Sequence, residues 1–250
     1  MTASRSRRTP ILTLFLMAHL PAAAFADSFV AVQDGFWKDP DTWGGKVPVI
    51  DDSVDSVTIP AGRTVVIQFA SAITLTNGSL LNDGTLAVPG SLTIIGGQLT
   101  NNGDLGIGPL GVLIVEELDS EFDNTGTFTN NGTFEPGIFS DLFNSGTIVN
   151  TAKFNHLPRC EFVNALSGVF ENSGVYRMSN FAETSNHGTI TNFGTIDLAW
   201  IDFVGIANSP VIANRGGTIT NAVGGEMIVD GRVFNGTSTG PTSTIAHSSG

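Results

Sequence analysis

The sequence contains one cysteine, Cys160, and only 14% of its 250 residues are charged. A single cysteine excludes an internal disulfide, so packing and backbone hydrogen bonds must stabilise the fold. We expect this thiol to be buried as a small hydrophobe, with pairing between two chains as the alternative. Apolar residues make up 41% of the chain and recur at regular places, which argues against disorder.

Basic side chains are scarce, with 11 Lys and Arg against 23 Asp and Glu and a net charge of −12. Arg5, Arg7 and Arg8 lie in the first 26 residues, which hold no acid. Without those residues, 8 basic side chains stand against 23 acidic ones, a net charge of −15. Such a surface repels nucleic acid and anionic lipid, so we expect no nucleic-acid partner.

Residues 1–26 have the features of a secretory signal peptide. The three arginines precede an apolar run from Ile11 to Leu20, and Ala24-Phe25-Ala26 fits the small-x-small rule for cleavage before Asp27. An uncleaved membrane anchor is the alternative, but a span needs about 20 apolar residues. The sequence predicts a secreted, extracellular or cell-surface protein with no membrane span in the mature chain.

Glycine is abundant, with 30 residues, and it does not fall at every third position as in collagen. It recurs in a motif, Gly-x-apolar-x-Asn followed by Gly-x-apolar, as in GTFTNNGTF at 126–134. The motif starts at positions 78, 97, 126, 146, 168, 188 and 217. Most of these intervals are close to 20 residues, and a fixed period in that range indicates a solenoid.

A finer period of six residues lies inside each repeat, as in Phe122, Phe128 and Phe134. A helix would place apolar residues three and four apart, so a spacing of six favours short strands joined by corners. The predicted fold is an all-β parallel β-solenoid with about seven coils of about 20 residues, each with three faces. The irregular coil length favours a right-handed β-helix, with a left-handed one as the alternative.

Asn and Gly are expected at two of the three corners, because a corner needs positive φ or a side-chain-to-backbone hydrogen bond. Asparagines at the same corner of stacked coils should bond along the stack. The third corner should absorb two insertions, near residues 106–120 and 197–211. The predicted corner residues are Asn82, Gly84, Asn101, Gly103, Asn130, Gly132, Asn144, Gly146, Asn172, Gly174, Asn192 and Gly194.

The chain divides into a signal peptide (1–26), an N-terminal capping segment (27–72), solenoid repeats (73–235) and a flexible tail (236–250). Because the first coil of a solenoid exposes an open edge and an apolar end, a cap is expected there. We assign this role to a cluster of tryptophan, proline and glycine in preference to a sugar-stacking role. The cap residues are Trp37, Trp43, Pro48, Pro60 and Gly62.

Residues 35–67 resemble the entry of the eight-glycine extracellular domain of fibrocystin-type and hyaluronan-processing proteins, and similar heads of bacterial surface proteins. The matching residues are Trp37, Thr42-Trp43, Gly44, Pro48, Asp52, Val57, Ile59-Pro60, Gly62 and Val65. The resemblance implies an extracellular β-helix, often one that meets carbohydrate. It does not imply catalysis.

Candidate ligand-contacting residues are few. Arg159 and Arg177 are 18 residues apart, close to one coil, while Trp200 and Asp202 lie in the second insertion; these four form the candidate ligand face. The repeat faces are expected to carry Thr, Ser and Asn rather than the aligned carboxylates of acid–base catalysis. We therefore predict no catalytic residue and no cofactor.

Metal sites are not supported by the spacing of their usual ligands. His156, His187 and His247 lie far apart, without the paired spacing of a zinc site. The acidic run at 116–123 offers oxygen ligands for calcium, but it lacks the glycine-containing spacing of calcium loops. The run comprises Glu116, Glu117, Asp119, Glu121 and Asp123, and we expect it to be a solvated face.

Together these features predict a secreted or surface-associated, structural, adhesin-like solenoid that presents a polar face to a glycan or a cell-surface protein. The alternative is an extracellular polysaccharide lyase or hydrolase of the β-helix type. Ice binding by ranks of threonine is disfavoured, because Leu81, Val149 and Glu171 interrupt such ranks.

Overall fold

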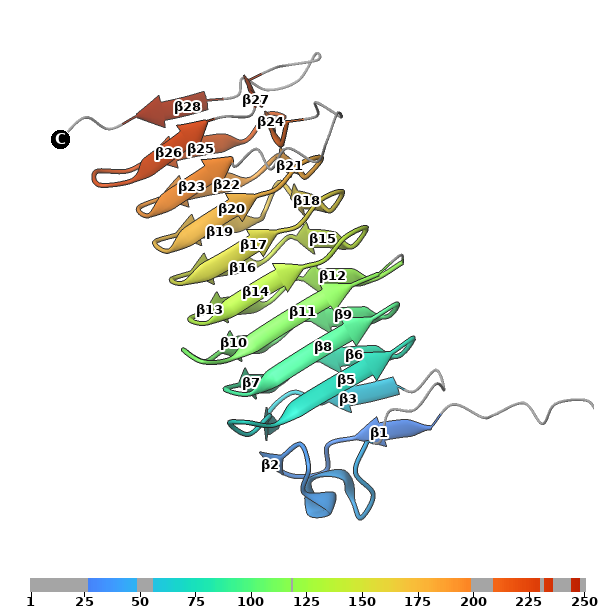
Figure 1. The fold of residues 1–250 in the computed structure, drawn as a ribbon. Helices are drawn as coiled ribbons and strands as arrows, with labels where there is room; N and C mark the ends of the chain where they lie inside the picture. The colour runs from blue at the N-terminus through green and yellow to red at the C-terminus, as the bar shows by residue number, and fades with distance from the viewer. Residues whose placement is uncertain are drawn as a thin grey trace, which may run out of the picture.

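The computed structural model describes residues 27–48, 56–117, 119–198, 209–229, 232–235 and 244–247. It is a β-solenoid in which the chain winds through three sheets, named A, B and C here (Figure 1). The paired strands of neighbouring coils are parallel. Eight coils contribute one strand to each sheet. The predicted fold class is confirmed, with one coil more than the sequence indicated.

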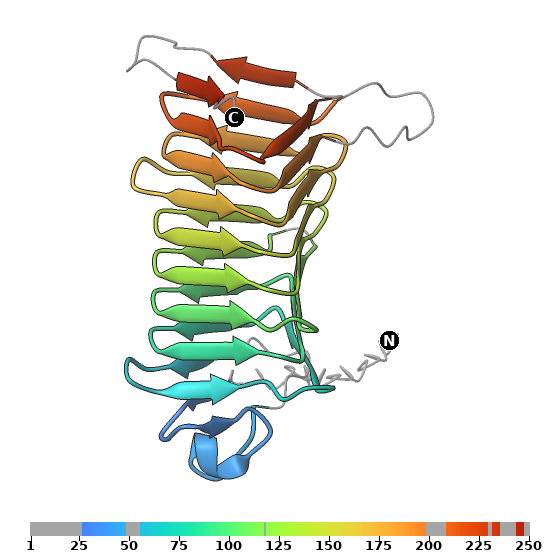
Figure 2. The same cartoon turned by 90° about the vertical axis from the view of Figure 1, so that its left-hand side faces the viewer.

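Each sheet is a stack of strands from successive coils (Figure 2). Sheet A contains β1 (Ser28–Val30), β3 (Ser56–Ile59), β6 (Ser79–Asn82), β9 (Gln98–Asn101), β12 (Glu121–Asn124), β15 (Asp141–Asn144), β18 (Glu161–Asn164), β21 (Glu183–Asn186), β24 (Val211–Asn214) and β27 (Arg232–Asn235). Sheet B contains β2 (Gly35–Phe36), β4 (Thr64–Val66), β7 (Thr85–Val88), β10 (Asp104–Ile107), β13 (Thr127–Asn130), β16 (Thr147–Asn150), β19 (Val169–Asn172), β22 (Thr189–Asn192), β25 (Thr218–Asn221) and β28 (Thr244–His247). Sheet C contains β5 (Ala72–Thr76), β8 (Ser91–Ile95), β11 (Val112–Glu116), β14 (Thr133–Pro136), β17 (Lys153–His156), β20 (Val175–Met178), β23 (Thr195–Leu198) and β26 (Glu226–Val229).

The six-residue period arises because each coil sends one apolar side chain inward from each sheet. Phe122 of β12, Phe128 of β13 and Phe134 of β14 are fully buried and meet edge to face, with ring centroids 4.9 to 5.6 Å apart. Strand side chains alternate, so their polar neighbours, such as Thr127 and Thr129, point away from the core. Burying each ring contributes about 1.5–3 kcal/mol, which makes this column the main source of stability.

Asparagines form two ladders inside the solenoid, each Asn occupying the last position of its strand. The side-chain amide nitrogen of Asn124 donates to the side-chain oxygen of Asn144 at 2.8 Å, and Asn144 donates in turn to Asn164. The sheet A ladder is Asn82, Asn101, Asn124, Asn144, Asn164, Asn186 and Asn214. The sheet B ladder is Asn130, Asn150, Asn172, Asn192 and Asn221. The predicted bonding along the stack is therefore present, and the asparagines are buried rather than displayed at the corners.

The corner glycines are required for a different reason from the predicted one. Gly84, Gly103 and their equivalents do not have positive φ, so that part of the prediction is wrong. A Cβ on Gly103 would collide with the carbonyl oxygen of Gly84 on the preceding coil, and a Cβ on Gly126 with that of Gly103. Glycine is needed at these corners because successive coils stack too closely there for any side chain.

The predicted insertion near residues 106–120 does not exist. Gly78 and Gly97 precede strands of sheet A, whereas Gly126 precedes a strand of sheet B. The longer interval between Gly97 and Gly126 therefore includes a step of one strand, together with slightly longer turns at 108–111 and 117–120. The second insertion does connect sheet C to sheet A, between β23 and β24, and its residues 199–208 lie outside the described part of the chain.

Both ends of the described chain contribute strands to the sheets. Strands β1 to β4, which fall in the predicted capping segment, pair within sheets A and B, and β28, in the predicted tail, pairs with β25. The 3-10 helix η1 (Pro40–Trp43) follows β2 and ends at Gly44, whose φ of 75° favours glycine.

The predicted cap residues lie at the start of the solenoid (Figure 2). Trp37 and Trp43 are buried, their ring centroids are 5.2 Å apart, and the indole nitrogen of Trp43 donates to the carbonyl oxygen of Trp37 at 2.7 Å. Pro48 is also buried, Pro60 is half-buried and ends β3, and Gly62 has a φ of 78° in the turn before β4. These residues place a compact aromatic pair beside the first coil.

Candidate functional site

The turns that lead from sheet C to sheet A share an unusual backbone. In each of the turns 117–120, 137–140, 157–160 and 179–182, the third residue is left-handed although it is not glycine. The residues are Asp119, Phe139, Arg159 and Phe181, with φ of 68°, 66°, 62° and 61°. A left-handed conformation costs a side-chain-bearing residue about 1–2 kcal/mol. We call this corner of the solenoid the C–A corner.

The side chains at this strained position stack on one another along the solenoid axis. The guanidinium carbon of Arg159 lies 5.1 Å from the ring centroid of Phe139 and 5.4 Å from that of Phe181. Phe139 is 41% exposed, and Arg159 is exposed as well. Each cation–π contact contributes about 0.5–1 kcal/mol at an exposed site. We call these three residues, which come from three successive coils, the Phe–Arg–Phe ridge.

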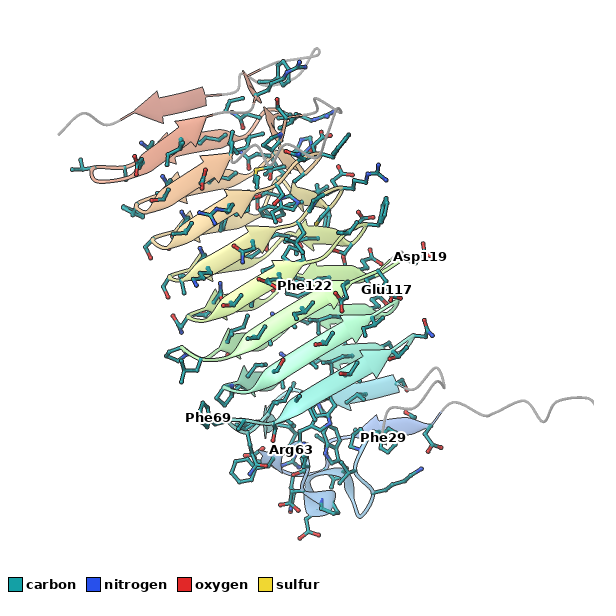
Figure 3. All side chains as sticks on the ribbon, in the orientation of Figure 1. Phe29, Arg63, Phe69, Glu117, Asp119 and Phe122 are labelled. Atoms are coloured by element: carbon teal, nitrogen blue, oxygen red, sulfur yellow. The ribbon has the colours of Figure 1, made fainter. Side chains whose placement is uncertain are left out.

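Two depressions lie next to the ridge. The larger, of about 450 Å³, is lined by the apolar side chains of Ile138, Phe139 and Leu157, with Glu116 and Glu117 beside them. Figure 3 shows Glu117 and Asp119 projecting from the C–A corner, while Phe122 points into the interior. The smaller depression, of about 210 Å³, is lined by Phe181, Ala182, Glu183, Ser209, Val211 and Arg232.

A column of carboxylates runs beside the ridge on the outer face of sheet A. Glu121, Asp141, Glu161 and Glu183 occupy the first position of successive strands and are direct neighbours in the strand pairing. Desolvation raises the pKa of Glu161 above its ordinary value, and the nearby Glu183 and Asp141 raise it further. Desolvation likewise raises the pKa of Glu121, together with the charges of Asp123 and Asp141. We call these four residues the acidic column.

Polar partners lie at both ends of the acidic column. Gln98 donates from its side-chain amide to Glu121 at 3.2 Å and to Asp123 at 3.5 Å. Arg215 donates to Glu183 at 2.9 Å. In the described residues no group of three or more His, Cys, Asp or Glu side chains is arranged to hold a metal ion. Glu116, Glu117 and Asp119 belong to the C–A corner, whereas Glu121 and Asp123 face outward from sheet A.

The prediction that the repeat faces lack aligned carboxylates is wrong for sheet A. The signal was present in the sequence, because each acid directly precedes the inward residue of its strand in the segments EFDN, DLFN, EFVN and ETSN. We aligned the repeats on their glycines, which placed sheet A segments against sheet B segments and hid the column. Aligning the buried asparagines would have shown it.

The four residues of the predicted ligand face are not all brought together. Arg159 is the centre of the ridge. Arg177 lies on the outer face of sheet C, where its Nε donates to Asp197 of the next coil at 3.0 Å. Trp200 and Asp202 fall within 199–208, outside the described residues, so the prediction for them stays open.

His156 and Cys160 are part of the core. Both ring nitrogens of His156 have polar neighbours: Nε2 lies 2.8 Å from the carbonyl oxygen of Cys160, and Nδ1 lies 2.9 Å from the hydroxyl of Tyr176. Because the carbonyl only accepts, Nε2 carries the proton and Nδ1 accepts from Tyr176, whose oxygen accepts from Thr184 at 2.5 Å. Burial lowers the pKa of His156 to about 4 and raises the pKa of the Cys160 thiol to about 12. Both groups are neutral at pH 7.

Comparisons with protein-family models, with curated proteins and with solved structures found no match to this chain. Within the residues that the structure describes, no helix is long and apolar enough to cross a bilayer. The function must therefore be argued from the geometry of the C–A corner.

Proposed function

We propose that this chain is an exported, structural β-solenoid that binds an extended partner, a glycan, along its C–A corner. The Phe–Arg–Phe ridge carries this proposal. Three consecutive turns hold a large non-glycine residue in a strained left-handed conformation, and strain of this kind concentrates at ligand-binding positions. The strain places two exposed rings and a guanidinium in line along the axis.

The chemistry of the ridge suits a carbohydrate. Phenyl faces pack against the apolar C–H faces of sugars, and a guanidinium offers several rigidly placed N–H donors for hydroxyl oxygens. Successive coils are about 4.8 Å apart, which is close to the rise of one sugar in an extended β-linked chain. A glycan lying along the axis would thus meet an equivalent turn at each sugar. A cell-surface protein is the competing partner.

Export is proposed from the segment at residues 1–26, with its arginines, its apolar run and its Ala24-Phe25-Ala26 cleavage pattern. The resemblance of residues 35–67 to the entry of the eight-glycine domain supports an extracellular setting. Proteolytic mapping of the mature N-terminus tests export: a chain beginning at Asp27 in the medium or on the cell surface supports it, and a full-length cytoplasmic chain contradicts it.

The binding proposal is tested with a glycan array followed by titration calorimetry of the strongest glycan. We expect Arg159→Gly and Phe139→Gly each to weaken binding at least fivefold, because they remove the cation and one ring of the ridge. Glycine relieves the left-handed strain at both positions, so the variants should keep the unfolding stability of the parent. Equal binding by parent and variants, or binding of no glycan, would overturn the proposal.

A hydrolase or lyase acting on polysaccharide is the second candidate function, and the acidic column favours it. Glycoside hydrolysis needs one protonated and one ionised carboxyl group close together, and neighbouring carboxylates push their pKa values apart. Glu161, with its raised pKa, lies between Asp141 and Glu183 in the pairing. Release of reducing ends from a polysaccharide, abolished in Glu161→Gln but kept in the sheet B variant Glu171→Gln, would support this function. Absence of release from a broad panel would exclude it.

A further inference from the structure

We infer that the glycan bound at the C–A corner carries free amino groups, so that the ligand class is a linear polymer of β-linked amino sugars. This inference rests on the proposed function and specifies its ligand. Its basis is the larger depression, whose apolar floor and two carboxylates define the chemistry of the group that fits there.

The floor of the depression is built from three consecutive coils. Ile138 is 48% exposed and lies beside Phe139 in one turn, and Leu157 belongs to the next turn. Glu116 ends strand β11 and Glu117 follows it, so both carboxylates come from the preceding coil. An apolar surface beside two carboxylates favours a group that is apolar on one side and positively charged on the other. A sugar ring with an amine has this character.

The charges around the depression exclude the opposite choice. Asp119 lies in the same turn as Glu117, and the acidic column begins two residues later at Glu121. Among the described residues the nearest cation along this corner is Arg159, whose guanidinium lies between two rings of the ridge. A polymer of acidic sugars would bring its carboxylates against these acids at every coil, where like charges repel. A polymer of amino sugars would pair with them.

The depression and the ridge share Phe139, which contacts Arg159 and also lines the depression. One extended ligand can therefore occupy both. The ridge supplies stacking that any hexose can use, whereas the depression supplies selectivity for an amine. The two contributions are separable by mutation, because Glu116 and Glu117 take no part in the ridge.

Titration calorimetry with three probes tests the inference: hexamers of β-linked glucosamine, of N-acetylglucosamine and of galacturonic acid. We expect the glucosamine hexamer to bind at least tenfold more tightly than the acetylated one, and the galacturonic acid hexamer not to bind. The double variant Glu116→Gln/Glu117→Gln should remove that preference while keeping ridge-dependent binding of the acetylated hexamer. Glu171→Gln, the same charge change on sheet B, should alter neither.

Several outcomes would overturn the inference, and they are distinct from failure of the proposed function. Equal binding of the two glucosamine-based hexamers that is lost in Arg159→Gly would refute the amine preference while leaving the glycan-binding corner intact. An equal loss in Glu171→Gln, or equally tight binding of a hexalysine peptide, would show unselective attraction to an acidic surface and refute the inference. If no hexamer binds at all, the proposed function falls together with it.

Discussion

The side-chain amide of Asn124 donates to the side-chain oxygen of Asn144 on the next coil at 2.8 Å, and the same amide donates to the backbone oxygen of Thr147 at 3.1 Å. Each ladder asparagine thus joins its neighbours within the interior, where an unpaired amide would be costly. The ladder fixes the register of sheet A, because a slip of one residue would leave these amides without partners.

Removing one rung should weaken the whole stack. We expect Asn144→Ala to lower the free energy of unfolding by about 2–4 kcal/mol, since it leaves the Asn164 side-chain oxygen unpaired and creates a cavity. Asn131→Ala is the matched control, because Asn131 is exposed and accepts one hydrogen bond from Thr151. It should cost less than about 1 kcal/mol in urea unfolding followed by circular dichroism. Equal costs for the two variants would refute the structural role of the ladder.

Two glycines within four residues of each other separate close approach from flexibility. Gly103→Ala should destabilise the fold by about 3 kcal/mol or more, because the new methyl group meets the backbone of Gly84. Gly106→Ala should be neutral or stabilising by about 0.5–1 kcal/mol, since no atom lies within 4 Å of the added Cβ. Thermal unfolding of both variants checks this, and a Gly103→Ala variant as stable as Gly106→Ala would contradict the stacking geometry.

Buried His156 should make stability depend on pH. Its pKa is about 4 in the folded chain and about 6.5 when unfolded, so the unfolded chain binds more protons between these values. Its contribution is therefore fully present above pH 6.5 and is lost as pH falls towards 4, by about 3 kcal/mol in total. Urea unfolding of the parent and of His156→Phe from pH 7.5 to 4 measures this. The difference between their pH profiles should vanish only if His156 is exposed, and that result would contradict the buried network.

The acidic column should oppose folding at neutral pH. The folded-state pKa of Glu161 is raised, so the folded chain binds its proton more tightly, and the stability present at low pH is lost as pH rises through that pKa. We expect Glu161→Gln to raise the free energy of unfolding at pH 7 by about 0.2–1 kcal/mol, by removing like charges opposite each other. Glu171→Gln on sheet B is the control and should change little. A destabilised Glu161→Gln variant would instead indicate an attractive partner for this carboxylate.

The sequence was sufficient for the fold because the core repeats with the coil. Phe122, Phe128 and Phe134 are spaced by the distance from one sheet to the next, and this spacing predicted a three-faced solenoid with few alternatives. The asparagine ladders followed from the same alignment. These features are periodic, so a single sequence displays them many times.

The candidate site was less predictable because it is built from what differs between repeats. Phe139, Arg159 and Phe181 occupy one position of the C–A turn, yet they share no residue type and their spacing varies with turn length. Arg159 was identified, but its two aromatic neighbours were not. The left-handed backbone that aligns them is not visible from residue types, since Phe and Arg rarely adopt it.

The central claim is that the C–A corner is the binding surface, and nuclear magnetic resonance of ring-labelled phenylalanine tests it most directly. Phe69 and Phe193 are exposed in turns between sheets B and C, 67% and 52% respectively, and serve as internal controls; Figure 3 shows Phe69 on the opposite side of the solenoid from Glu117. During titration with whichever amino-sugar hexamer binds more tightly, the signals of Phe139 and Phe181 should shift while those of Phe69 and Phe193 stay unchanged. Shifts at Phe69 or Phe193 without shifts at Phe139 and Phe181 would contradict the account.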